Sequence, residues 1–530
     1  SSTTGADTKD CGSLAAPCRS IQYAVNNAQS GDVILVAEGT YTYNASTDIF
    51  NQLGNTGVIL VVNKALTILG GYNPNNWYMR DTDRFKTVID GENAYRGVYV
   101  VKTDSPAGLR LEGFTIENGL GLADRNRSGN DGIFGFGGGM LVEGGSLTLE
   151  DIIFRNNRAK GVNTTYGYGG SGSGGGLALR NTPSLIKLKN ITFEGNTAEG
   201  GKGPERGGLG IGGGLYTFGS TVLGENLSFH DNVAIGGSSG GDGYSANLHA
   251  DAQGGGATFQ RGSNVTLKYV DVTHNQALGG ETPQGNPGGA FGGGFFTEDA
   301  DLYLYDSFVF GNLAEGGDGV NDGSTPGAGY ARGGGIATTD SDVLILRTSV
   351  TNNTSRGGDG QIRMGSAAGG GVGSVRLVGD YLVEISNSVI ADNLAQLGNG
   401  TKVVGGGGGG LWLQGTEAEI NHTTIAGNEV SNSSMQGQAI LLLADGMPTP
   451  SVANIHYCII ADHKNNWGAV VAVHSKSDNG PNSNNLASLY QGLWAGNSIN
   501  INSDGKFSGL DTMIVDSRAG FTSPGFPDYD

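Results

Sequence analysis

The sequence predicts an all-β chain folded as a right-handed parallel β-helix, a solenoid of stacked three-strand coils. A glycine-triplet motif recurs at nearly constant spacing, and an asparagine motif closes each repeat. Inside one repeat, short segments alternate apolar with small or polar residues, as strands with one buried face do. These three observations favour a solenoid over separate globular domains.

Eight glycine triplets divide the middle of the chain into repeats, and each is followed by an apolar residue. Their last glycines stand 36 to 42 residues apart. A period of that length indicates a solenoid, a propeller or another array. The triplets end at Gly139, Gly176, Gly214, Gly256, Gly294, Gly335, Gly371 and Gly410.

An asparagine three residues after Phe, Val or Ile closes each repeat, and alanine follows two places later in most repeats. We expect these asparagines to stack at one corner, where left-handed backbone is tolerated and amides hydrogen bond along the axis. The glycine triplets are expected at the opposite corner. The predicted ladder consists of Asn157, Asn196, Asn232, Asn275, Asn312, Asn353, Asn393 and Asn428.

The contents of one repeat distinguish a β-helix from a propeller. Leu177–Leu179, Ile186–Leu188 and Ile191–Phe193 are three strand candidates, whereas a propeller blade needs four strands joined by hairpins. The remainder of each repeat is glycine-rich and aperiodic. We expect these loops to leave at one corner and to form one rough face.

The cassette of Gly213-Gly214-Leu215 and Phe229-His230-Asp231-Asn232 resembles the repeat of the polymorphic outer-membrane protein family. Its equivalents cover about residues 137–430. The resemblance implies a secreted β-helical passenger, often an adhesin. The chain departs from the family pattern because Val or Ile replaces Phe from Val272 onward.

The N-terminal segment predicts a cap. Ile21, Val25 and Ala28 fall on one helical face before the strand Val33–Val36. This segment is similar to the entry of pectin-lyase-like β-helices, which implies a helix that covers the first coil. Cys11 and Cys18 are either a disulfide or two free thiols, and we predict the disulfide, which indicates an oxidising compartment.

We expect one continuous solenoid in four sections. Residues 1–45 hold the N-terminal arm, the capping helix and the first strand, and residues 46–136 form irregular early coils. Residues 137–430 form eight regular coils. Residues 431–530 form the C-terminal coils and a closing segment.

The charge limits the partners. A formal net charge of −19 disfavours nucleic acid and anionic membranes. The chain contains no apolar run near the ~20 residues of a membrane span. We expect an extracellular or cell-surface protein whose partner is a surface or matrix component, a polysaccharide or a second copy.

Catalytic signatures are missing from the sequence, and no cofactor is required. Gly-Gly-Asp-Gly recurs at Asp242, Asp318 and Asp359, which are either a calcium site or solvated turn residues. His230 and His274 fall near one corner of adjacent coils, where we expect a stacked, exposed pair. Trp77 either stacks on a sugar or packs down its own insertion.

The sequence therefore predicts a structural or adhesive protein that uses its loops. Tyr244, Leu248 and His249 are the bulky residues of the loop Gly236–Gln253 and are the expected partner contacts. One alternative is a polysaccharide-active enzyme, either a lyase or a hydrolase. The other is a subunit of an extracellular filament.

Overall fold

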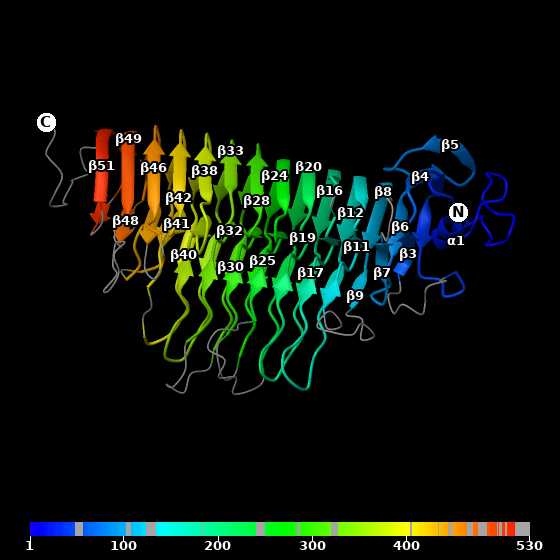
Figure 1. The fold of residues 1–530 in the computed structure, drawn as a ribbon, viewed down its shortest axis with the longest axis horizontal. Coiled ribbons are helices and arrows are strands. Elements are labelled where there is room, and N and C mark those ends of the chain that lie inside the picture. Colours follow the sequence, from blue (N-terminus) through cyan, green and yellow to red (C-terminus); the bar gives the residue numbers. More distant parts are fainter. Residues whose placement is uncertain are drawn as a thin grey trace.

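The computed structural model is an elongated stack of coils, with the capping helix at one end and the last coils at the other (Figure 1). It describes residues 1–47, 57–101, 108–122, 134–182, 184–239, 250–282, 287–319, 327–402, 405–432, 434–443, 447, 449–463, 470–474, 485–495, 497, 501–503 and 506–514. The prediction of a parallel β-helix is confirmed. Within these residues no helix is long and apolar enough to cross a membrane.

The regular coils contribute strands to four parallel sheets, named sheets A to D, except that the last regular coil has no sheet D strand among its described residues. In one coil β18 leads through a glycine triplet into β19, then β20, then the ladder asparagine and β21. Sheet A has 22 strands, and all its pairings are parallel except that of β4 with β5. In the early coils the strands of sheet A are long, because the second and third predicted strands join into one, as in β16. Two short strands per coil, in sheets C and D, were not predicted.

The bounds of the elements follow the repeat. The single helix of the described residues is α1 (Ile21–Asn27). Sheet A contains β1 (Val33–Ala37), β2 (Gly39–Tyr41), β4 (Leu66–Asn73), β5 (Asn76–Arg80), β6 (Thr87–Asp90), β8 (Gly108–Glu117), β12 (Ser146–Arg155), β16 (Ile186–Glu194), β20 (Thr221–His230), β24 (Asn264–Thr273), β28 (Asp301–Tyr305), β29 (Phe308–Phe310), β33 (Val343–Leu346), β34 (Ser349–Thr351), β38 (Leu382–Ser386), β39 (Val389–Ala391), β42 (Glu417–Asn421), β43 (Thr424–Ala426), β46 (Val452–His456), β47 (Ile459–Ala461), β49 (Leu486–Ala495) and β51 (Lys506–Ile514).

Sheet B contains β3 (Gly57–Val62), β7 (Arg96–Val101), β11 (Met140–Glu143), β15 (Leu177–Arg180), β19 (Leu215–Phe218), β23 (Ala257–Gln260), β27 (Phe295–Glu298), β32 (Ile336–Thr339), β37 (Val372–Val375), β41 (Leu411–Gln414), β45 (Ile440–Leu443), β48 (Val471–His474) and β50 (Ile501–Ser503). Sheet C contains β9 (Leu120–Leu122), β13 (Arg158–Lys160), β17 (Thr197–Glu199), β21 (Val233–Ile235), β25 (Gln276–Leu278), β30 (Leu313–Glu315), β35 (Thr354–Arg356), β40 (Leu394–Gln396) and β44 (Glu429–Val430). Sheet D contains β10 (Gly135–Phe136), β14 (Gly172–Ser173), β18 (Gly210–Ile211), β22 (Ala252–Gln253), β26 (Ala290–Phe291), β31 (Ala331–Arg332) and β36 (Ala367–Ala368).

Apolar side chains from sheets A and B fill the interior. Along β16 the alternate residues Ile186, Leu188, Ile191 and Phe193 are fully or almost fully buried, while their neighbours face solvent. Equivalent residues stack from coil to coil. The rings of Phe154 and Phe193 lie 5.1 Å apart between centroids and nearly parallel. The alternation therefore fixes which face of every strand is available for function.

The buried asparagines form a continuous amide ladder. Asn275 Nδ2 donates to Asn312 Oδ1 at 3.0 Å and to the carbonyl of Phe229 at 2.9 Å. Its own Oδ1 accepts from the backbone N and the Nδ2 of Asn232 at 3.0 and 2.9 Å. Because the side chain is 0% exposed, these hydrogen bonds satisfy groups that water cannot reach.

Two sequence expectations about this corner are wrong. The left-handed backbone falls on the residue before the ladder asparagine, with φ of 53° at Asp231 and 55° at His274. The glycine triplets also do not lie at an opposite corner. A Cβ on Gly256 would stand 3.3 Å from the Asn275 amide carbon and 2.8 Å from the Gly294 carbonyl oxygen. The glycine triplets thus lie against the asparagine ladder, and the space between them is too small for a side chain.

The ladder extends beyond the predicted asparagines. Gly119 N donates to Asn157 Oδ1 at 2.8 Å, so Gly119 occupies the same position one coil earlier. After Asn428 the position passes to His463, whose backbone N donates to Asn497 Oδ1 at 3.2 Å. Asn497 Nδ2 donates to the Ile460 carbonyl at 3.0 Å, as the ladder asparagines do to their preceding coils.

The described parts of the glycine-rich loops are ordered from coil to coil, whereas the sequence suggested one rough, aperiodic face. Their outgoing and returning segments pack together as paired arms, seen below the body of the molecule in Figure 1. Gly201 N donates to Gly170 O at 2.7 Å, Gly208 N to Gly201 O at 2.8 Å and Gly237 N to Gly208 O at 2.8 Å. A Cβ on Gly208 would lie 1.8 Å from Gly170 O. Glycine is therefore required, because the outgoing and returning segments hydrogen bond backbone to backbone and leave no room for a side chain.

The helix α1 caps the first coils. Ser20 accepts a hydrogen bond from Tyr23 N at 3.2 Å as its N-cap. Gln22 donates to Leu60 O at 3.2 Å and accepts from Leu60 N at 2.6 Å, which joins the helix to β3. Lys64 Nζ donates to the carbonyls of Val25, Asn26 and Ala28 near the helix end.

Removing an interior rung of the ladder should destabilise the stack. We expect Asn275→Ala to lower the free energy of unfolding by about 1–3 kcal/mol, because it leaves buried polar groups without partners. Asn428→Ala should cost less, since His463 replaces asparagine in the following coil. Chemical denaturation of both variants measures this, and equal, negligible shifts would contradict the ladder assignment.

The buried histidine predicts a pH dependence of the C-terminal coils. Burial lowers the pKa of His463 from 6.5 to about 4. Above pH ~6.5 the imidazole is neutral in both the folded and the unfolded chain. Below that value the unfolded chain binds a proton that the folded chain does not, so stability falls between pH ~6.5 and ~4, by up to about 3 kcal/mol. Thermal unfolding of His463→Asn, which restores the ladder residue, should lose this component, and an unchanged pH profile would contradict it.

Candidate functional site

The outer face of sheet A changes character along the axis. Toward the N-terminus it carries ion pairs between coils: Glu150 accepts from Arg110 at 2.8 Å and from Lys189 at 2.9 Å. Near the C-terminus the equivalent positions carry rings. His422 stacks on Tyr457 with centroids 4.9 Å apart, and His456 stacks on Tyr490 at 4.7 Å. The aromatic patch is defined here as His422, His456, Tyr457, Ile459 and Tyr490.

The backbone explains why these side chains point outward. His422 and Tyr457 both have left-handed φ, 50° and 55°, in the bend between the two halves of the sheet A strands. His456 and Tyr490 are paired residues of β46 and β49 on the outward side of the alternation. The stacked rings thus follow the coil-to-coil hydrogen-bond register, with neighbouring strands ~4.8 Å apart.

The aromatic patch is exposed, and none of its five residues is an aspartate, a glutamate, a lysine or an arginine. Tyr457 is 53%, Ile459 40% and Tyr490 39% exposed. A contiguous apolar surface of this kind marks an interaction site more often than a lone exposed residue does. Beside it Asn454 Nδ2 donates to Glu419 Oε1 at 2.6 Å, so hydrogen-bonding groups border the rings.

A second aromatic group lies on the same face nearer the middle of the stack. The rings of Phe308 and Phe310 lie 5.4 Å apart at an interplanar angle of 12°. Tyr269, 47% exposed, has the Lys268 ammonium 4.5 Å from its ring centroid. The face therefore carries rings in two places along one axis.

Two carboxylates on adjacent coils accompany this second group. Asp301 begins β28, and Asp342 stands at the equivalent position of the next coil, where its carbonyl accepts from Leu302 N at 2.9 Å. Burial, with the Asp342 charge, raises the pKa of Asp301. Burial also raises the pKa of the two flanking tyrosines, Tyr303 and Tyr381, with Asp301 and Asp342 adding to the shift.

This arrangement has a chemical use. A carboxyl group whose pKa is raised is better suited to donate a proton, and a second carboxyl group nearby offers an acceptor. Paired carboxylates with separate roles are the means of glycoside hydrolysis. Asp342 is held in place because its Oδ1 accepts from Leu382 N at 2.8 Å.

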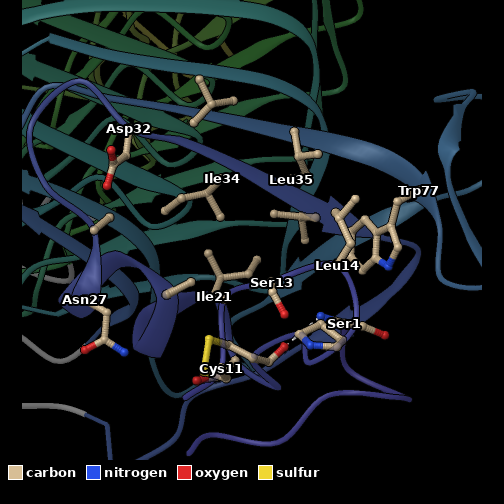
Figure 2. Close-up of a pocket in the computed structure, with 18 of the residues that line it drawn as sticks. Ser1, Cys11, Ser13, Leu14, Ile21, Asn27, Asp32, Ile34, Leu35 and Trp77 are labelled. Atoms are coloured by element: carbon tan, nitrogen blue, oxygen red, sulfur yellow. Dashed lines mark hydrogen bonds between the residues drawn. A yellow bond between two sulfur atoms is a disulfide. The ribbon is translucent and has the colours of Figure 1, made fainter. Parts of the chain in front are cut away.

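A pocket of about 520 Å³ lies at the N-terminal end, between the arm, α1 and β1. Figure 2 shows Trp77 on the same side of this pocket as Leu14 and Leu35. The Trp77 ring lies 6.2 Å from that of Tyr72, so it packs against its own hairpin as well as lining the pocket. The lining mixes apolar residues such as Leu14 and Leu35 with polar ones such as Ser13, and its place between the arm and α1 suits a role in covering the first coil.

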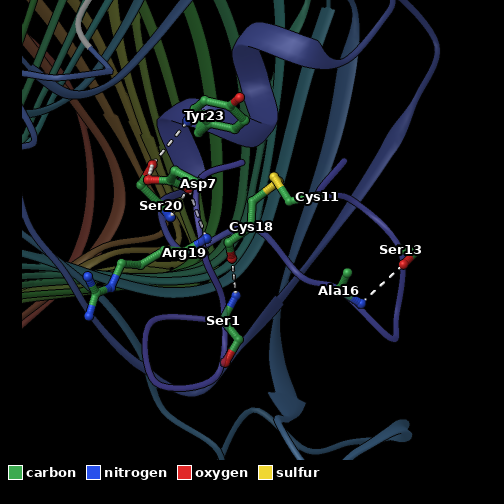
Figure 3. Close-up of a disulfide and its surroundings, with 9 residues drawn as sticks. All are labelled: Ser1, Asp7, Cys11, Ser13, Ala16, Cys18, Arg19, Ser20 and Tyr23. Atoms are coloured by element: carbon green, nitrogen blue, oxygen red, sulfur yellow. Dashed lines mark hydrogen bonds between the residues drawn. A yellow bond between two sulfur atoms is a disulfide. The ribbon is translucent and has the colours of Figure 1, made fainter. Parts of the chain in front are cut away.

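The arm beside this pocket is held by a disulfide and a carboxylate (Figure 3). Cys11 and Cys18 are bonded, with S–S 2.03 Å. Asp7 accepts from the backbone N of Arg19 and of Ser20 at 2.9 Å each. Cys458 is buried and free, and burial raises the pKa of its thiol to about 11.

The predicted calcium residues are partly described. Asp318 Oδ1 accepts from Asp359 N at 2.7 Å, and Asp359 in turn binds Arg356 at 2.7 Å and the Asn399 side chain at 2.8 Å. A cation at Asp359 would have to displace an arginine, so calcium at this pair stays a prediction with little support. Asp242 and the loop residues Tyr244, Leu248 and His249 lie outside the described residues.

His230 and His274 do come together, and Asp231 joins them. Their ring centroids are 6.1 Å apart at 69°, an edge-on contact, so the expectation of a stacked pair is wrong. The different positions of the two histidines relative to their asparagines cause this, because His230 ends β20 while His274 occupies the bend that follows β24.

Comparison with known proteins adds the fold alone. No family model and no curated protein matches the sequence. A double mutant of the periplasmic alginate epimerase AlgG is similar at 9% identity and TM-score 0.34, over 86% of this chain and 78% of that one. The A-module of the Azotobacter vinelandii mannuronan C-5 epimerase AlgE4 has 10% identity and TM-score 0.30, over 91% and 100%. The catalytic domain of a GH87 alpha-1,3-glucanase variant with nigerose has 11% identity and TM-score 0.27, over 97% and 67%.

The strand pairings of the described residues by themselves establish a parallel β-helix. At these identities and TM-scores the neighbours carry no argument about substrate or reaction. The resemblance of the repeat to polymorphic outer-membrane proteins stays a prediction, since no family model matches.

The aromatic patch and the carboxylate pair were missed from the sequence, although a signal was present. His422 and Tyr457 each stand six residues before the ladder residue of their coil, Asn428 and His463. Asp301 and Asp342 each stand eleven residues before theirs, Asn312 and Asn353. Aligning the repeats on the ladder and reading each column would have placed these side chains together.

Proposed function

We propose that the protein is an extracellular or cell-surface β-helix that binds an extended neutral glycan on the outer face of sheet A, in an adhesive role. The aromatic patch is the observation that carries this proposal. Its stacked rings are exposed on a face whose other half is covered by ion pairs.

The physical basis is the match between flat rings and the apolar faces of sugars. Tyrosine offers a large apolar surface and a polar hydroxyl, and it loses few rotamers on binding. Tyr490 stands on β49, which pairs with β46 and β47 on one side and with β51 on the other. Tyr457 occupies the bend between β46 and β47, where its backbone N donates to Tyr490 O at 3.0 Å. A rigid site of this kind avoids the ordering cost that a loop would incur.

Charge selects the class of glycan. The chain carries a formal net charge of −19, so acidic polysaccharides such as alginate or polygalacturonate are repelled at long range. The patch itself offers rings, amides and imidazoles. These groups suit a neutral chain of sugars, whose hydroxyls hydrogen bond at the border of the rings.

The disulfide supports the location. Bonded cysteines persist in oxidising compartments and are rare in the reducing cytosol. The Cys11–Cys18 bond closes the arm that covers the first coil. An external location brings the outer face of sheet A into contact with surface and matrix glycans.

Removing the tyrosines should weaken glycan binding without unfolding the chain. We expect Tyr457→Ala combined with Tyr490→Ala to weaken binding about tenfold or more, a loss of ~1.4 kcal/mol or more. Affinity electrophoresis in gels that contain neutral β-glucans, xylans and mannans, with alginate for comparison, measures the change.

Tyr166→Ala is the matched control, because Tyr166 is 88% exposed but lies on a loop arm. It should bind as the unchanged protein does. Binding that survives the double substitution, or that Tyr166→Ala reduces equally, would contradict a site on sheet A.

A second candidate function is cleavage of the bound glycan. The observation that favours it is the Asp301–Asp342 pair, in which the pKa of Asp301 is raised beside two tyrosines. The pair lies on the same face as the aromatic patch, so one glycan chain running along the axis reaches both.

If the pair is catalytic, Asp301→Asn should abolish the release of reducing ends while glycan binding stays unchanged. Asp271→Asn, an exposed aspartate of the neighbouring β24, should leave the release intact. Reducing-end assays on each glycan that the protein binds decide the matter. No release by the unchanged protein would eliminate cleavage and leave the binding proposal standing.

A further inference from the structure

We propose that His230, Asp231 and His274 form a binding site for a divalent transition-metal ion such as Zn²⁺. Each residue offers one ligand atom, and the three atoms all lie within 4.8 Å of one another. This cluster is independent of the aromatic patch and of the carboxylate pair.

The geometry is close to what a metal requires. His230 Nε2 lies 3.3 Å from Asp231 Oδ2. Ligand atoms around a tetrahedral ion, with bonds of about 2.0–2.2 Å, lie roughly 3.3–3.5 Å apart. The His230–Asp231 pair is therefore already at ligand spacing, and the His274 ligand atom lies within 4.8 Å of both.

The backbone beneath the cluster is among the most constrained in the molecule. Asp231 and His274 are equivalent residues of adjacent coils, each with left-handed φ immediately before a buried ladder asparagine. Because the amide ladder fixes both bends, the ligands have little freedom to separate. Preorganised ligands of this kind raise metal affinity.

The residues around the cluster leave room for it. The neighbouring coils place glycine at the same bend on either side, at Gly195 and Gly311, each with positive φ. A Cβ on Gly311 would lie 3.1 Å from His274 Nε2, so glycine lets the imidazole lie flat against the coil. Phe310 contacts the His274 ring edge-on at 5.6 Å.

A second interaction orients the first imidazole. Thr273 Oγ1 lies 3.3 Å from His230 Nδ1, and Nε2 faces Asp231. A partner on one ring nitrogen fixes which nitrogen is available to a metal. On the preceding coil His230 pairs in register with Glu194, whose carboxylate is bound by Arg155 at 3.1 Å.

The ligand set selects the ion. Two imidazoles and one carboxylate suit Zn²⁺ and neighbouring transition metals, while Ca²⁺ and Mg²⁺ prefer oxygen ligands alone. The side chains of His230 and Asp231 are 43% and 59% exposed, so a bound ion keeps a coordination position open to water or to a partner group. An ion held by β20 and by the bend after β24 also cross-links two coils.

Zinc titration of the full-length, untagged protein after chelator treatment and dialysis tests this site. Isothermal calorimetry at pH 7.5 should show one Zn²⁺ bound per chain, with no binding of Ca²⁺. Zinc should also raise the thermal unfolding temperature, because an ion that binds only the folded chain stabilises it.

The variants come from the repeat itself. Asparagine occupies the bend before the ladder at Asn156 and Asn352, with left-handed φ, so His274→Asn and Asp231→Asn keep a backbone that the fold already uses. Each should weaken zinc binding at least tenfold. His422→Asn is the matched control, since asparagine stands at its position in other coils, at Asn226 and Asn387, and it should bind zinc as the unchanged protein does.

Three results would overturn the proposal: no zinc binding by the unchanged protein at millimolar zinc, binding unaffected by both cluster variants, or binding lost equally in His422→Asn. If one cluster variant unfolds, the other still decides, because the two change different ligands of the same ion.

Discussion

The structure depends on a column of buried amides. Each interior asparagine both donates and accepts along the axis, and each Nδ2 also binds a carbonyl of the preceding coil. The column sits where the chain turns sharply from sheet A into sheet C, so it fixes the position of every coil relative to the next. A slip of one residue would leave buried donors and acceptors unpaired, which costs more than any single surface contact returns.

Because the ladder fixes the register, residues at the same sequence distance from it in successive coils lie side by side and form columns on the surface. Most columns on sheet A carry ordinary polar groups, and the ion pairs among them contribute little to stability because they are exposed. Ring columns such as His422–Tyr457 and His456–Tyr490 are a different case, since exposed rings do not improve solubility. The same argument separates the His230–Asp231–His274 cluster from the other coils, where asparagine, glycine or aspartate occupies the position before the ladder residue.

The sequence was sufficient for the architecture because architecture repeats. Glycine triplets, inward apolar residues and ladder asparagines each recur in every regular coil, so one physical explanation applies many times. The helix α1 and its amphipathic face were also predictable from local pattern. Side chains that occur once were harder, because His463 extends the ladder without being asparagine. The one local signal is Ile460, which stands three residues before it as the apolar residue does in the regular repeats.

Two further features could not be predicted locally. The glycine arms form because backbones approach each other across the loop, with Gly208 bonded to Gly201 and Gly201 to Gly170. Composition alone suggested irregular loops, since the spacing between the partners differs from coil to coil. The Asp301–Asp342 pair likewise depends on strand register, which sets which side chains of distant segments become neighbours.

Hydroxyl-radical footprinting in the presence of a bound neutral glycan tests the central claim most directly, because it reports side-chain protection across the whole surface in one measurement. The account predicts protection of His422, Tyr457 and Tyr490 with no change at Tyr166 and Tyr168 on the loop arm. Protection confined to the arms, with the rings on sheet A as reactive as in the free protein, would contradict it.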